Sequence, residues 1–347
     1  MYHVIMCGGV GSRFWPMSTN KIPKQFLKLI DNKSLLRLTV DRLLEVSNPD
    51  KILIISSIKY KKIISAELPE IPQNNILYEP SPMNTAPAIY LASKYVELIN
   101  SKETIGIYPA DHYIKDTSTF KQNINDISRY IDNNKKNICT LGINPSYPST
   151  SYGYIECEKN EKEGVHSVFK FKEKPNLDTA KKLVENNQFV WNSGMFFSNV
   201  STMIAEIDRY IPKLSNLYSS IDYDKDNFLN KIDSIWNEMP KISIDYAVME
   251  KSDNIYCMKS DFGWSDLGTW VALYELLEKD NDGNVLNGNI LKYDAKNNLI
   301  FSDSNLVTVV GLDNVGVINY NGKILVIDLE KSEEVRHIIE QLDNKDK

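Results

Sequence analysis

The sequence predicts an α/β protein with a Rossmann-like, mixed and mostly parallel sheet flanked by helices, followed by a small β-rich module. Over residues 2–143, short apolar runs rich in β-branched residues alternate with segments of helical period. Strands that alternate with helices at this spacing form βαβ units, in which the strands run parallel. After Asp282-Gly283 the chain changes to short β-rich pieces separated by Asn, Asp and Gly, which predicts an independent all-β module.

The first half supplies the expected parallel units. The expected strands are YHVIMC (2–7), KILIIS (51–56), NNILYE (74–79), ETIGIYP (103–109) and NICTLGI (137–143). The expected helices are 34–46, 60–68, 86–99 and 119–131, and either Asn84 or Thr85 is expected to cap the third.

The second half predicts a mixed pattern. YGYIECE (152–158) and VHSVFKFKEKP (165–175) are expected to pair antiparallel, and FVWNSGMFFSN (189–199) to be a strand with an internal turn. Helical segments are expected to about residue 250, then β-pieces at 289–294, 298–303, 306–312, 315–320 and 323–328, and a short helix from 335. The predicted domains are 1–281 and 282–347.

Composition narrows the function classes. The chain has 347 residues and a formal net charge of −6, which argues against a non-specific nucleic-acid binder but leaves room for a nucleotide pocket. Its four cysteines are scattered, so neither a disulfide framework nor a structural zinc site is expected. No apolar run approaches the roughly 18 residues of a membrane span, and no leader pattern opens the chain. The expected location is the cytoplasm.

A glycine-rich loop, CGGVGSRFWPM, follows the first strand. Glycines in such a turn let backbone N–H groups approach anionic oxygens, and Arg13 and Lys24 add cations suited to phosphate. The spacing is neither a Walker A motif nor a clean G-x-G-x-x-G. Taken alone, the loop fits a tight turn with a solvated arginine equally well.

Two aspartates are candidate metal ligands. Asp111 follows a strand end, and Asp266 precedes a helical run in FGWSDLGTW. Two carboxylates brought together over a polyphosphate would hold Mg²⁺. Helix capping is the rival reading of Asp266. Because ligands sit beyond the carboxyl ends of parallel strands, the glycine loop, Glu79 and Asp111 are expected to face one crevice.

Several polar residues of the second half are of the types that recognise hydroxyls and phosphates. Glu173 and Lys174 precede a proline in FKEKPN, Asn192 lies in WNSGMFF, and Gly153 lies between two tyrosines. Each of them alone is more often a solvated or structural residue.

Read together, these stretches resemble the nucleotide-sugar pyrophosphorylases, and among them the bacterial mannose-1-phosphate guanylyltransferases (GDP-mannose pyrophosphorylases). The matching pieces occur in the family's order over roughly residues 3–270: CGGVGSRFWPMS with IPKQFL, EPSPMNTAPAI, YPADHYI, SYGYIE, FKEKP, WNSGMFF, SIDYAVMEKS and GWSDLGTW. The resemblance implies a nucleotidyltransferase domain of the GT-A-like type and a C-terminal module similar to a left-handed β-helix.

The resemblance also implies roles for individual residues. Gly8, Gly9, Gly11 and Arg13 would wrap the GTP phosphates with support from Lys24, and Glu79, Asn84 and Thr85 would hold the guanosine. Asp111 and Asp266 would bind Mg²⁺, Gly153, Glu173 and Asn192 would line the sugar pocket with Asp245 nearby, and Lys174 would meet the sugar phosphate. The catalytic set so implied is Arg13, Lys24, Asp111, Lys174 and Asp266.

The implied reaction transfers GMP from GTP to mannose 1-phosphate by in-line attack on the α-phosphate. Two alternatives stay open: a nucleotidyltransferase for another sugar 1-phosphate such as a heptose, and a catalytically silent subunit that senses nucleotide sugars. Trp15-Pro16 after the loop favours guanine over other bases. The expected partners are GTP and mannose 1-phosphate, without nucleic acid or membrane. A homodimer stays open, with the β-rich tail as a candidate docking surface.

Overall fold

The computed structural model describes residues 1–9, 11–162 and 164–343, so the last four residues of the expected C-terminal module lie outside the described residues. The chain divides into two compact units, each made of several stretches. The first unit comprises Met1–Gly8, Thr39–Ala110 and Ile114–Trp264, and the second comprises Gly9–Leu38, Asp111–Tyr113 and Ser265–Lys347. Each unit is described by itself.

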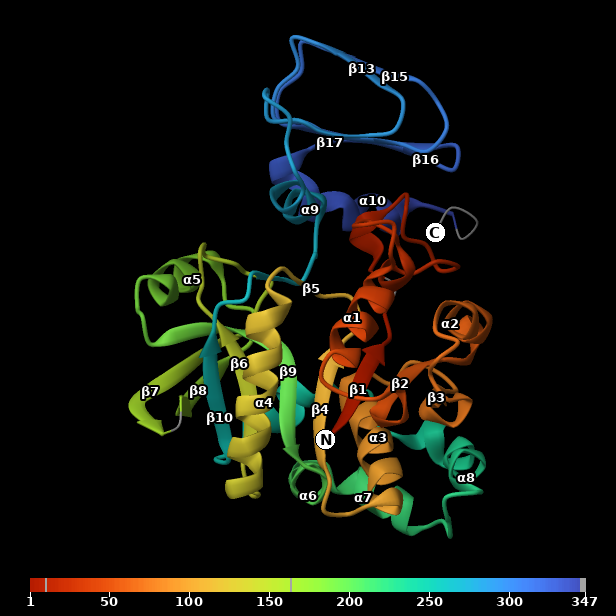
Figure 1. The fold of residues 1–347 in the computed structure, drawn as a ribbon, viewed down its shortest axis with the longest axis vertical. Helices are drawn as coiled ribbons and strands as arrows, with labels where there is room; N and C mark the ends of the chain where they lie inside the picture. Colours follow the sequence, from red (N-terminus) through yellow and green to blue (C-terminus); the bar gives the residue numbers. More distant parts are fainter. Residues whose placement is uncertain (10, 163, 344–347) are drawn as a thin grey trace. The chain divides into compact units, whose positions relative to one another are not determined.

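The first unit is built on a mixed sheet (Figure 1). Among the described residues its strands follow the order β3-β2-β1-β4-β9-β6-β10-β8-β7. They are β1 (Tyr2–Cys7), β2 (Ile52–Ser57), β3 (Ile76–Glu79), β4 (Thr104–Pro109), β6 (Ile138–Ile143), β7 (Tyr154–Lys162), β8 (Val165–Lys172), β9 (Phe189–Asn199) and β10 (Ile255–Ser260). The strands β3, β2, β1 and β4 pair in parallel, as the alternating pattern predicts.

Beyond β4 the pairing changes direction. β9 runs antiparallel to both β4 and β6, and β7 pairs antiparallel with β8, as expected for that hairpin. Because β7 also pairs with β9, the five strands β9-β6-β10-β8-β7 close on themselves. The turn expected inside residues 189–199 is wrong. β9 is one strand with a register shift against β6, and Gly194 takes a φ of 70° there.

Helices flank this sheet (Figure 1). They are α2 (Lys61–Glu67), α3 (Thr85–Ile99), α4 (Thr117–Asn133), α5 (Leu177–Val184), α6 (Val200–Tyr210), α7 (Pro212–Ser219) and α8 (Phe228–Ile235), while α1 (Leu35–Leu44) begins among residues of the second unit. The carboxamide of Asn84 accepts the Thr85 N–H at 2.8 Å, which confirms the predicted cap of α3.

The core of the first unit covers both faces of the parallel strands. In β1, β2, β4 and β6 nearly every residue is buried, which is typical of strands enclosed between helices. Tyr218 of α7 and Phe228 of α8 belong to the same core, as does Trp236 directly after α8. The four cysteines are free and buried, as is typical of cysteines that pack as small apolar residues.

The second unit contains the β-rich module. Its strands are β12 (Val285–Asn287), β13 (Ile290–Tyr293), β14 (Leu299–Ser302), β15 (Val307–Val310), β16 (Val315–Tyr320) and β17 (Lys323–Asp328). Successive coils stack in parallel as β12-β14-β16 and as β13-β15, and β17 ends the first of these sheets antiparallel. This is the β-helix-like arrangement that the family resemblance implies.

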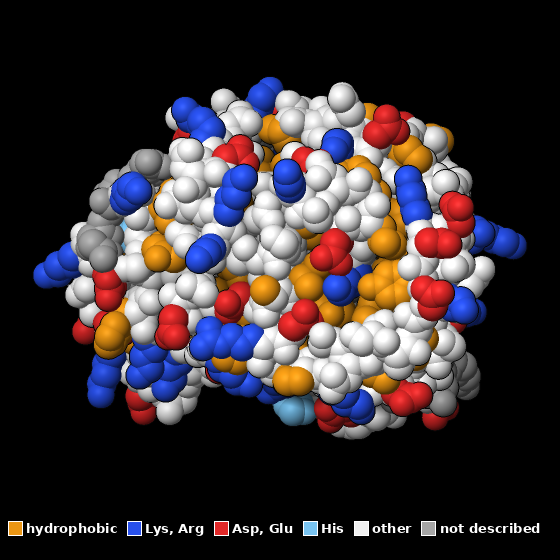
Figure 2. Space-filling model, turned by 90° about the horizontal axis from the view of Figure 1, so that it is seen from below, with side chains coloured by type: hydrophobic (Ala, Val, Ile, Leu, Met, Phe, Trp, Pro, Cys, Tyr) orange, Lys and Arg blue, Asp and Glu red, His pale blue; other side chains and the backbone are white. Residues whose placement is uncertain are grey.

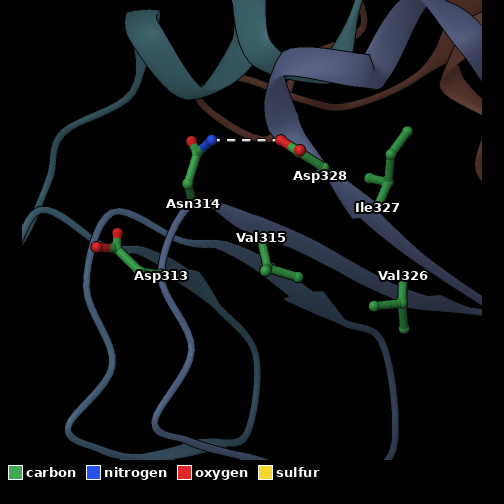
Figure 3. A pocket seen from close by; sticks show the side chains of 6 residues that line it. All are labelled: Asp313, Asn314, Val315, Val326, Ile327 and Asp328. Carbon is green, nitrogen blue, oxygen red and sulfur yellow. Dashed lines mark hydrogen bonds between the residues drawn. The ribbon is translucent and has the colours of Figure 1, made fainter.

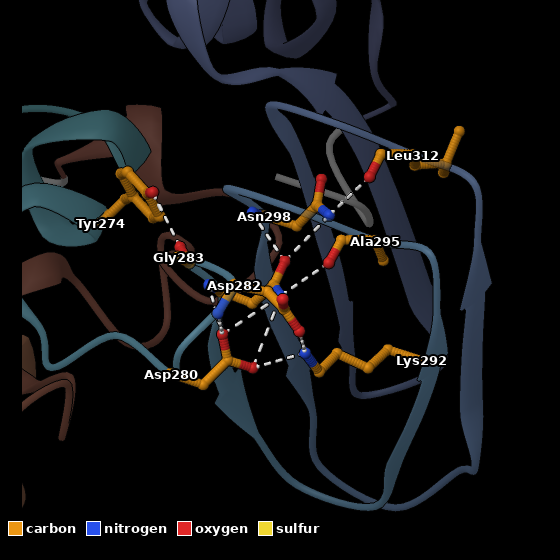
Figure 4. Close-up of polar contacts among 9 residues, drawn as sticks. Tyr274, Asp280, Asp282, Gly283, Lys292, Ala295, Asn298 and Leu312 are labelled. Atoms are coloured by element: carbon orange, nitrogen blue, oxygen red, sulfur yellow. Dashed lines mark hydrogen bonds and ion pairs between the residues drawn. The ribbon is translucent and has the colours of Figure 1, made fainter.

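Buried asparagines join one coil of the module to the next (Figure 4). The carboxamide of Asn298 donates to Asn284 Oδ1 at 3.0 Å and to the Leu312 carbonyl at 2.9 Å. Asn284 in turn donates to the Ala295 carbonyl at 2.8 Å. Such ladders satisfy the turn carbonyls that a stack of coils buries.

Two helices, α9 (Trp270–Leu276) and α10 (Val335–Gln341), pack with the module in the second unit. Trp270 contacts Phe14 and Phe301, so the aromatic core links the segment after the glycine loop to the β-coils. At one end of the module a small cavity of about 260 Å³ is lined by Asp313, Asn314, Val315, Val326, Ile327 and Asp328 (Figure 3).

Surface charge is mixed on the face shown in Figure 2, where lysines and arginines are interspersed with aspartates and glutamates. Hydrophobic side chains on this face form small groups. Among the described residues no helix combines the length and the apolar character that a membrane crossing needs.

Candidate active site

The carboxyl ends of β1, β3 and β4 lie at the same edge of the sheet. The register pairs Met6 of β1 with Pro109 of β4, and Ser57 of β2 with Glu79 of β3. Because β2 lies between β1 and β3, all of these parallel strands end at the same edge. A Cβ on Gly8 would lie 4.0 Å from Glu79 Oε2, which places the start of the glycine loop beside this carboxyl group. The edge is where ligands bind in open parallel sheets.

Glu79 is a buried carboxyl group at this edge. The residue is 8% exposed, and burial raises the pKa of its carboxyl group to about 7. A carboxyl group with that pKa is present in both protonation states near neutral pH. Such a perturbed group at a strand end is typical of a functional site.

The start of α3 adds two further predicted residues. Asn84 takes a φ of 70°, and its side chain caps the helix. The hydroxyl of Thr85 accepts the Ile244 N–H at 2.9 Å, which ties the helix start to the segment before Asp245. Both side chains therefore have a structural bond, and their contact with guanosine stays a prediction.

In the second unit, glycine conformation shapes the predicted phosphate-binding loop. Gly9 and Gly11 have φ values of 84° and 64°, and Gly11 begins the 3₁₀ turn η1 (Ser12–Phe14). A Cβ on Gly11 would lie 2.3 Å from the Cβ of Lys24. Only glycine permits this approach of the loop to Lys24.

Lys24 lies in η2 (Lys24–Phe26) and holds the two predicted metal ligands together. Its side chain is buried, with 5% of the residue exposed. The ammonium group donates to Asp111 Oδ2 at 2.8 Å and to the main-chain carbonyl of Asp266 at 2.5 Å. The structure thus brings Asp111 and Asp266, far apart in sequence, into contact with the same cation.

The charge of Lys24 decides the protonation of Asp111. Burial alone would raise the pKa of the Asp111 carboxyl, but the Lys24 ammonium and then His112 outweigh it, and the pKa is lowered. With 31% of its side chain exposed, Asp111 remains accessible as a carboxylate.

Asp266 lies in a tight turn with Gly268, and Arg13 contacts this turn. The Gly268 N–H donates to Asp266 Oδ1 at 2.9 Å, and Arg13 Nη1 donates to the Gly268 carbonyl at 3.4 Å. The rival reading of Asp266 as a helix cap is wrong, because the Thr269 hydroxyl caps α9 by accepting the Ala272 N–H at 3.3 Å. The Asp266 carboxylate is therefore not committed to the helix end.

These side chains fit a hard divalent cation. Among the described residues no group of three or more His, Cys, Asp or Glu forms a closed metal cage. Mg²⁺ is typically held by one or two carboxylates plus substrate phosphates, which matches Asp111 and Asp266 beside the cations Arg13 and Lys24. The donor set suits a metal that arrives with a nucleotide.

The predicted sugar residues form a second cluster, within the first unit. Asn192 donates to Asp245 Oδ1 at 3.0 Å and, through its main chain, to the Gly153 carbonyl at 2.8 Å. Lys174 pairs with Glu173 at 2.9 Å. A Cβ on Gly153 would lie 2.4 Å from Glu173 Oε2, so this glycine lets the carboxylate approach the strand.

Charge is unevenly balanced in this cluster. Burial, and then the neighbouring Glu173, raises the pKa of Asp245 to about 6, and the contacts with Asn192 and Lys174 only partly oppose the rise. Burial would lower the pKa of Lys174, but its bond and charge contact with Glu173 raise it overall. Lys174 stays an ammonium at neutral pH and is 55% exposed in its side chain, available to an anion.

Two residues near these clusters escaped the sequence reasoning. A Cβ on Gly268 would lie 2.8 Å from Asp266 Oδ2 and 3.2 Å from Arg13 Nη1, so a side chain there would disturb both. Tyr246 is half exposed beside Asp245 in a π-helical turn, η7 (Asp245–Met249). The D-x-G spacing after Asp266 was a usable signal for Gly268, whereas nothing in sequence marks a π-helical turn.

Each unit therefore gathers part of the predicted set. The first unit holds Gly8, Glu79, Asn84, Thr85, Gly153, Glu173, Lys174, Asn192 and Asp245, and the second holds Gly9, Gly11, Arg13, Lys24, Asp111 and Asp266. Apart from Gly8, the predicted phosphate and metal residues lie in the second unit, and the predicted sugar residues lie in the first.

Known proteins carry the same organisation. The Nucleotidyl transferase family model matches residues 2–283, and a MannoseP isomerase/GMP-like beta-helix domain model matches residues 288–342. A mannose-1-phosphate guanylyltransferase of Escherichia coli is 35% identical over 98% of this chain and 75% of its own length. One of Sinorhizobium fredii (strain NBRC 101917 / NGR234) is also 35% identical, over 97% of this chain and 67% of its own.

A solved structure agrees with these relatives over nearly the whole chain. The crystal structure of mannose-1-phosphate geranyltransferase from Thermus thermophilus superposes with a TM-score of 0.87 at 28% identity, covering 98% of both chains. The chain belongs to the nucleotidyl transferase family, and within it to the mannose-1-phosphate guanylyltransferases.

Proposed function

We propose that this protein transfers GMP from GTP to mannose 1-phosphate and releases pyrophosphate, giving GDP-mannose. As an enzyme of this family it takes a nucleoside triphosphate and a sugar phosphate as substrates. One observation carries the proposal: Lys24 joins the carboxylate of Asp111 to the main chain of Asp266, close to Arg13 in sequence and fold. Cations and carboxylates together are what transfer between phosphates requires.

The reaction needs no covalent intermediate on the protein. An oxygen of the sugar phosphate attacks the α-phosphorus of GTP in line, and the bond from that phosphorus to the β-phosphate oxygen breaks. The guanidinium of Arg13 and the ammonium of Lys24 would offset the charge that develops on the departing pyrophosphate. Backbone N–H groups at Gly8, Gly9 and Gly11 would hold its oxygens.

A divalent metal ion is commonly used by this family, and we assign Mg²⁺ to Asp111 and Asp266. When bound, Mg²⁺ supplies neutralisation of charge on the reacting phosphates. Lys24 would keep the pKa of Asp111 low, so that this ligand is ready as a carboxylate. The turn at Gly268 would hold the Asp266 carboxylate in place through the N–H bond.

The sugar phosphate is assigned to the second cluster. Glu173, Asn192 and Asp245 offer oxygens and an amide that suit sugar hydroxyls, and the main chain at Gly153 lies against them. The ammonium of Lys174 would bind the phosphate of the sugar. Hydroxyl stereochemistry is read by such groups, because an unmatched hydroxyl leaves a buried polar atom unpaired.

The nucleoside is assigned to the edge after β3. The carboxyl of Glu79 and the side chains of Asn84 and Thr85 would hold the guanosine there. We further propose a catalytic domain over residues 1–281, a β-helix-like domain over 282–347, a cytoplasmic location without nucleic-acid or membrane partners, and a homodimer docked through the β-rich tail.

A pyrophosphate-release assay tests the proposal. Purified protein with Mg²⁺ is supplied with GTP, ATP, UTP or dTTP, each in combination with mannose, glucose or heptose 1-phosphate. Release with GTP and mannose 1-phosphate well above every other pair is expected. Preference for another pair would replace the substrates, and release with none of them would favour a nucleotide-sugar-sensing subunit, which binding of GDP-mannose alone would then identify.

A further inference from the structure

A buried chain of hydrogen bonds runs from α1 to the end of β4. Thr39 and Arg42, one turn apart on α1, are 1% and 6% exposed. Arg42 Nη2 donates to Thr39 Oγ1 at 3.1 Å, and Thr39 Oγ1 donates to the Ala110 carbonyl at 3.3 Å. The Thr39 hydroxyl is thereby used as both acceptor and donor, which fixes its rotamer.

The carbonyl at the end of this chain belongs to the peptide bond between Ala110 and Asp111. The other side of Ala110 is anchored too, because its N–H donates to the Met6 carbonyl at 3.1 Å. Ala110 itself is 1% exposed. The bond from Thr39 therefore holds the peptide plane that leads into Asp111, and the bond to Met6 holds the preceding peptide plane.

Burying the charged side chain of Arg42 at this position is energetically unfavourable. Its guanidinium lies 5.6 Å from the centre of the Phe120 ring, and a buried charge carries a desolvation penalty that an apolar side chain would avoid. Packing alone does not explain an arginine at this position. Through its hydrogen bond to Thr39, Arg42 supports the contact of Thr39 with the strand end.

We infer that Thr39 and Arg42 are positioning residues for the metal ligand Asp111: they hold the Ala110–Asp111 peptide so that the carboxylate stays in its binding orientation. This inference rests on the proposed function through the role of Asp111. Partners that orient a metal ligand typically change metal affinity or activity by about 10–100-fold when removed.

The test compares Thr39→Val, which removes the hydroxyl at similar volume, with Thr39→Ser, which keeps it. Ser93→Ala is the matched control, because the Ser93 hydroxyl is also buried and donates to a main-chain carbonyl, that of Ile89 at 2.7 Å, within α3. The readouts are the Mg²⁺ concentration for half-maximal rate, the KM for mannose 1-phosphate, and Mn²⁺ binding followed by electron paramagnetic resonance with saturating GDP-mannose.

We expect Thr39→Val to weaken Mn²⁺ binding and raise the half-maximal Mg²⁺ concentration by about tenfold, with little change in the sugar KM. Thr39→Ser should restore both values, and Ser93→Ala should leave them at the wild-type level. If Thr39→Val and Ser93→Ala behave alike, the positioning role is overturned. Should Thr39→Val not fold, Arg42→Met carries the same expectation and the same contradiction.

Failure of the proposed function gives a different result. If the wild-type protein neither releases pyrophosphate nor binds Mn²⁺ with GDP-mannose, both the function and this inference fail together. If the wild type does both and the Thr39 and Arg42 variants behave like the wild type, the function stands and the inference alone fails.

Discussion

At the scale of single residues, buried carboxyl groups acquire different protonation behaviour from their neighbours. Burial raises the pKa of Glu79 to about 7 and that of Asp245 to about 6, whereas Lys24 reverses the effect of burial at Asp111. At Asp111 the contact with a cation outweighs burial, whereas at Glu79 and Asp245 burial dominates the pKa. Asp111 and Asp245 are the same residue type, so the opposite shifts of their pKa values come from their neighbours.

The metal assignment predicts a loss of turnover in Asp111→Asn and in Asp266→Asn. An amide is a weaker Mg²⁺ ligand than a carboxylate, so kcat should fall by on the order of 10²–10³ while the binding of GTP changes little. Initial rates and GTP binding by calorimetry measure the two effects. Near-normal turnover in both variants would remove these residues from the metal site.

The raised pKa of Asp245 predicts a pH-dependent stability difference. The pKa is about 6 in the folded protein and roughly 3.9 unfolded, so the folded state binds the extra proton between these values and loses that advantage as pH rises. Asp245→Asn should therefore be more stable than the wild type above pH 6, by roughly 1–3 kcal/mol, and equal to it below pH 4. Urea unfolding at pH 4 and pH 8 checks the sign, and an equal difference at both pH values would contradict it.

The sequence identifies the chemistry-bearing residues better than it identifies their contacts. Asp111 and Asp266 stand out because of their position after a strand and before a helix, yet only the folded chain shows Lys24 between them. A contact between residues 24 and 266 depends on tertiary packing, which local patterns do not encode. For the same reason the sequence does not show that Thr269, and not Asp266, caps the following helix.

At the scale of elements, the turn after β11 (Trp264–Ser265) depends on a small residue. Gly268→Ala would place a Cβ 2.8 Å from Asp266 Oδ2, closer than real Cβ contacts. The carboxylate or the turn must shift, so turnover should fall by about tenfold or more, as misplacement of a reacting group does. Melting temperature is the control: a loss of activity that only tracks a loss of stability would contradict a local effect.

In the β-rich module the asparagine ladder should carry part of the stability. Asn298→Ala removes the donor to Leu312 and Asn284 and the acceptor for the Val315 N–H, all of which are then left with fewer partners. The free energy of unfolding should drop by about 2–3 kcal/mol. Asn305→Ala, at an exposed position of the same module, is the matched control and should change stability by less than about 0.5 kcal/mol. Equal effects would refute the ladder.

Most elements are predictable because their periodicity is strong. β1 occupies residues 2–7 as expected, and the five β-pieces after residue 289 each contain one observed strand. The exceptions depend on distant partners. Pairing of β9 with three neighbours replaces the expected turn by a register shift, and the π-helical turn at Asp245 has no local signal. Burial patterns determine strands, whereas pairing partners determine their irregularities.

At the scale of the whole molecule, the family and the fold agree along the chain. The net charge is −6 and charge is mixed on the face shown in Figure 2, so we expect anionic substrates to bind through local cations such as Arg13, Lys24 and Lys174. The family model matches residues 2–283, which include these three cations, and the solved relative covers 98% of the chain. We therefore expect the protein to discriminate between ligands by both their base and their sugar.

Ligand specificity should therefore be visible in the stability of the intact protein. A ligand that binds only the folded state at about 100 times its Kd adds roughly 2.7 kcal/mol. With an unfolding entropy of about 2.1 cal/mol/K per residue, the 347 residues convert this into a rise of about 4 °C in Tm. GDP-mannose with Mg²⁺ should give this rise in differential scanning fluorimetry, while UDP-glucose and GDP-glucose at the same concentration should give less. The GDP-glucose arm isolates the sugar hydroxyls from the base, and the UDP-glucose arm changes both. A larger shift with UDP-glucose than with GDP-mannose would overturn the assignment of guanine, because a single Kd governs each shift.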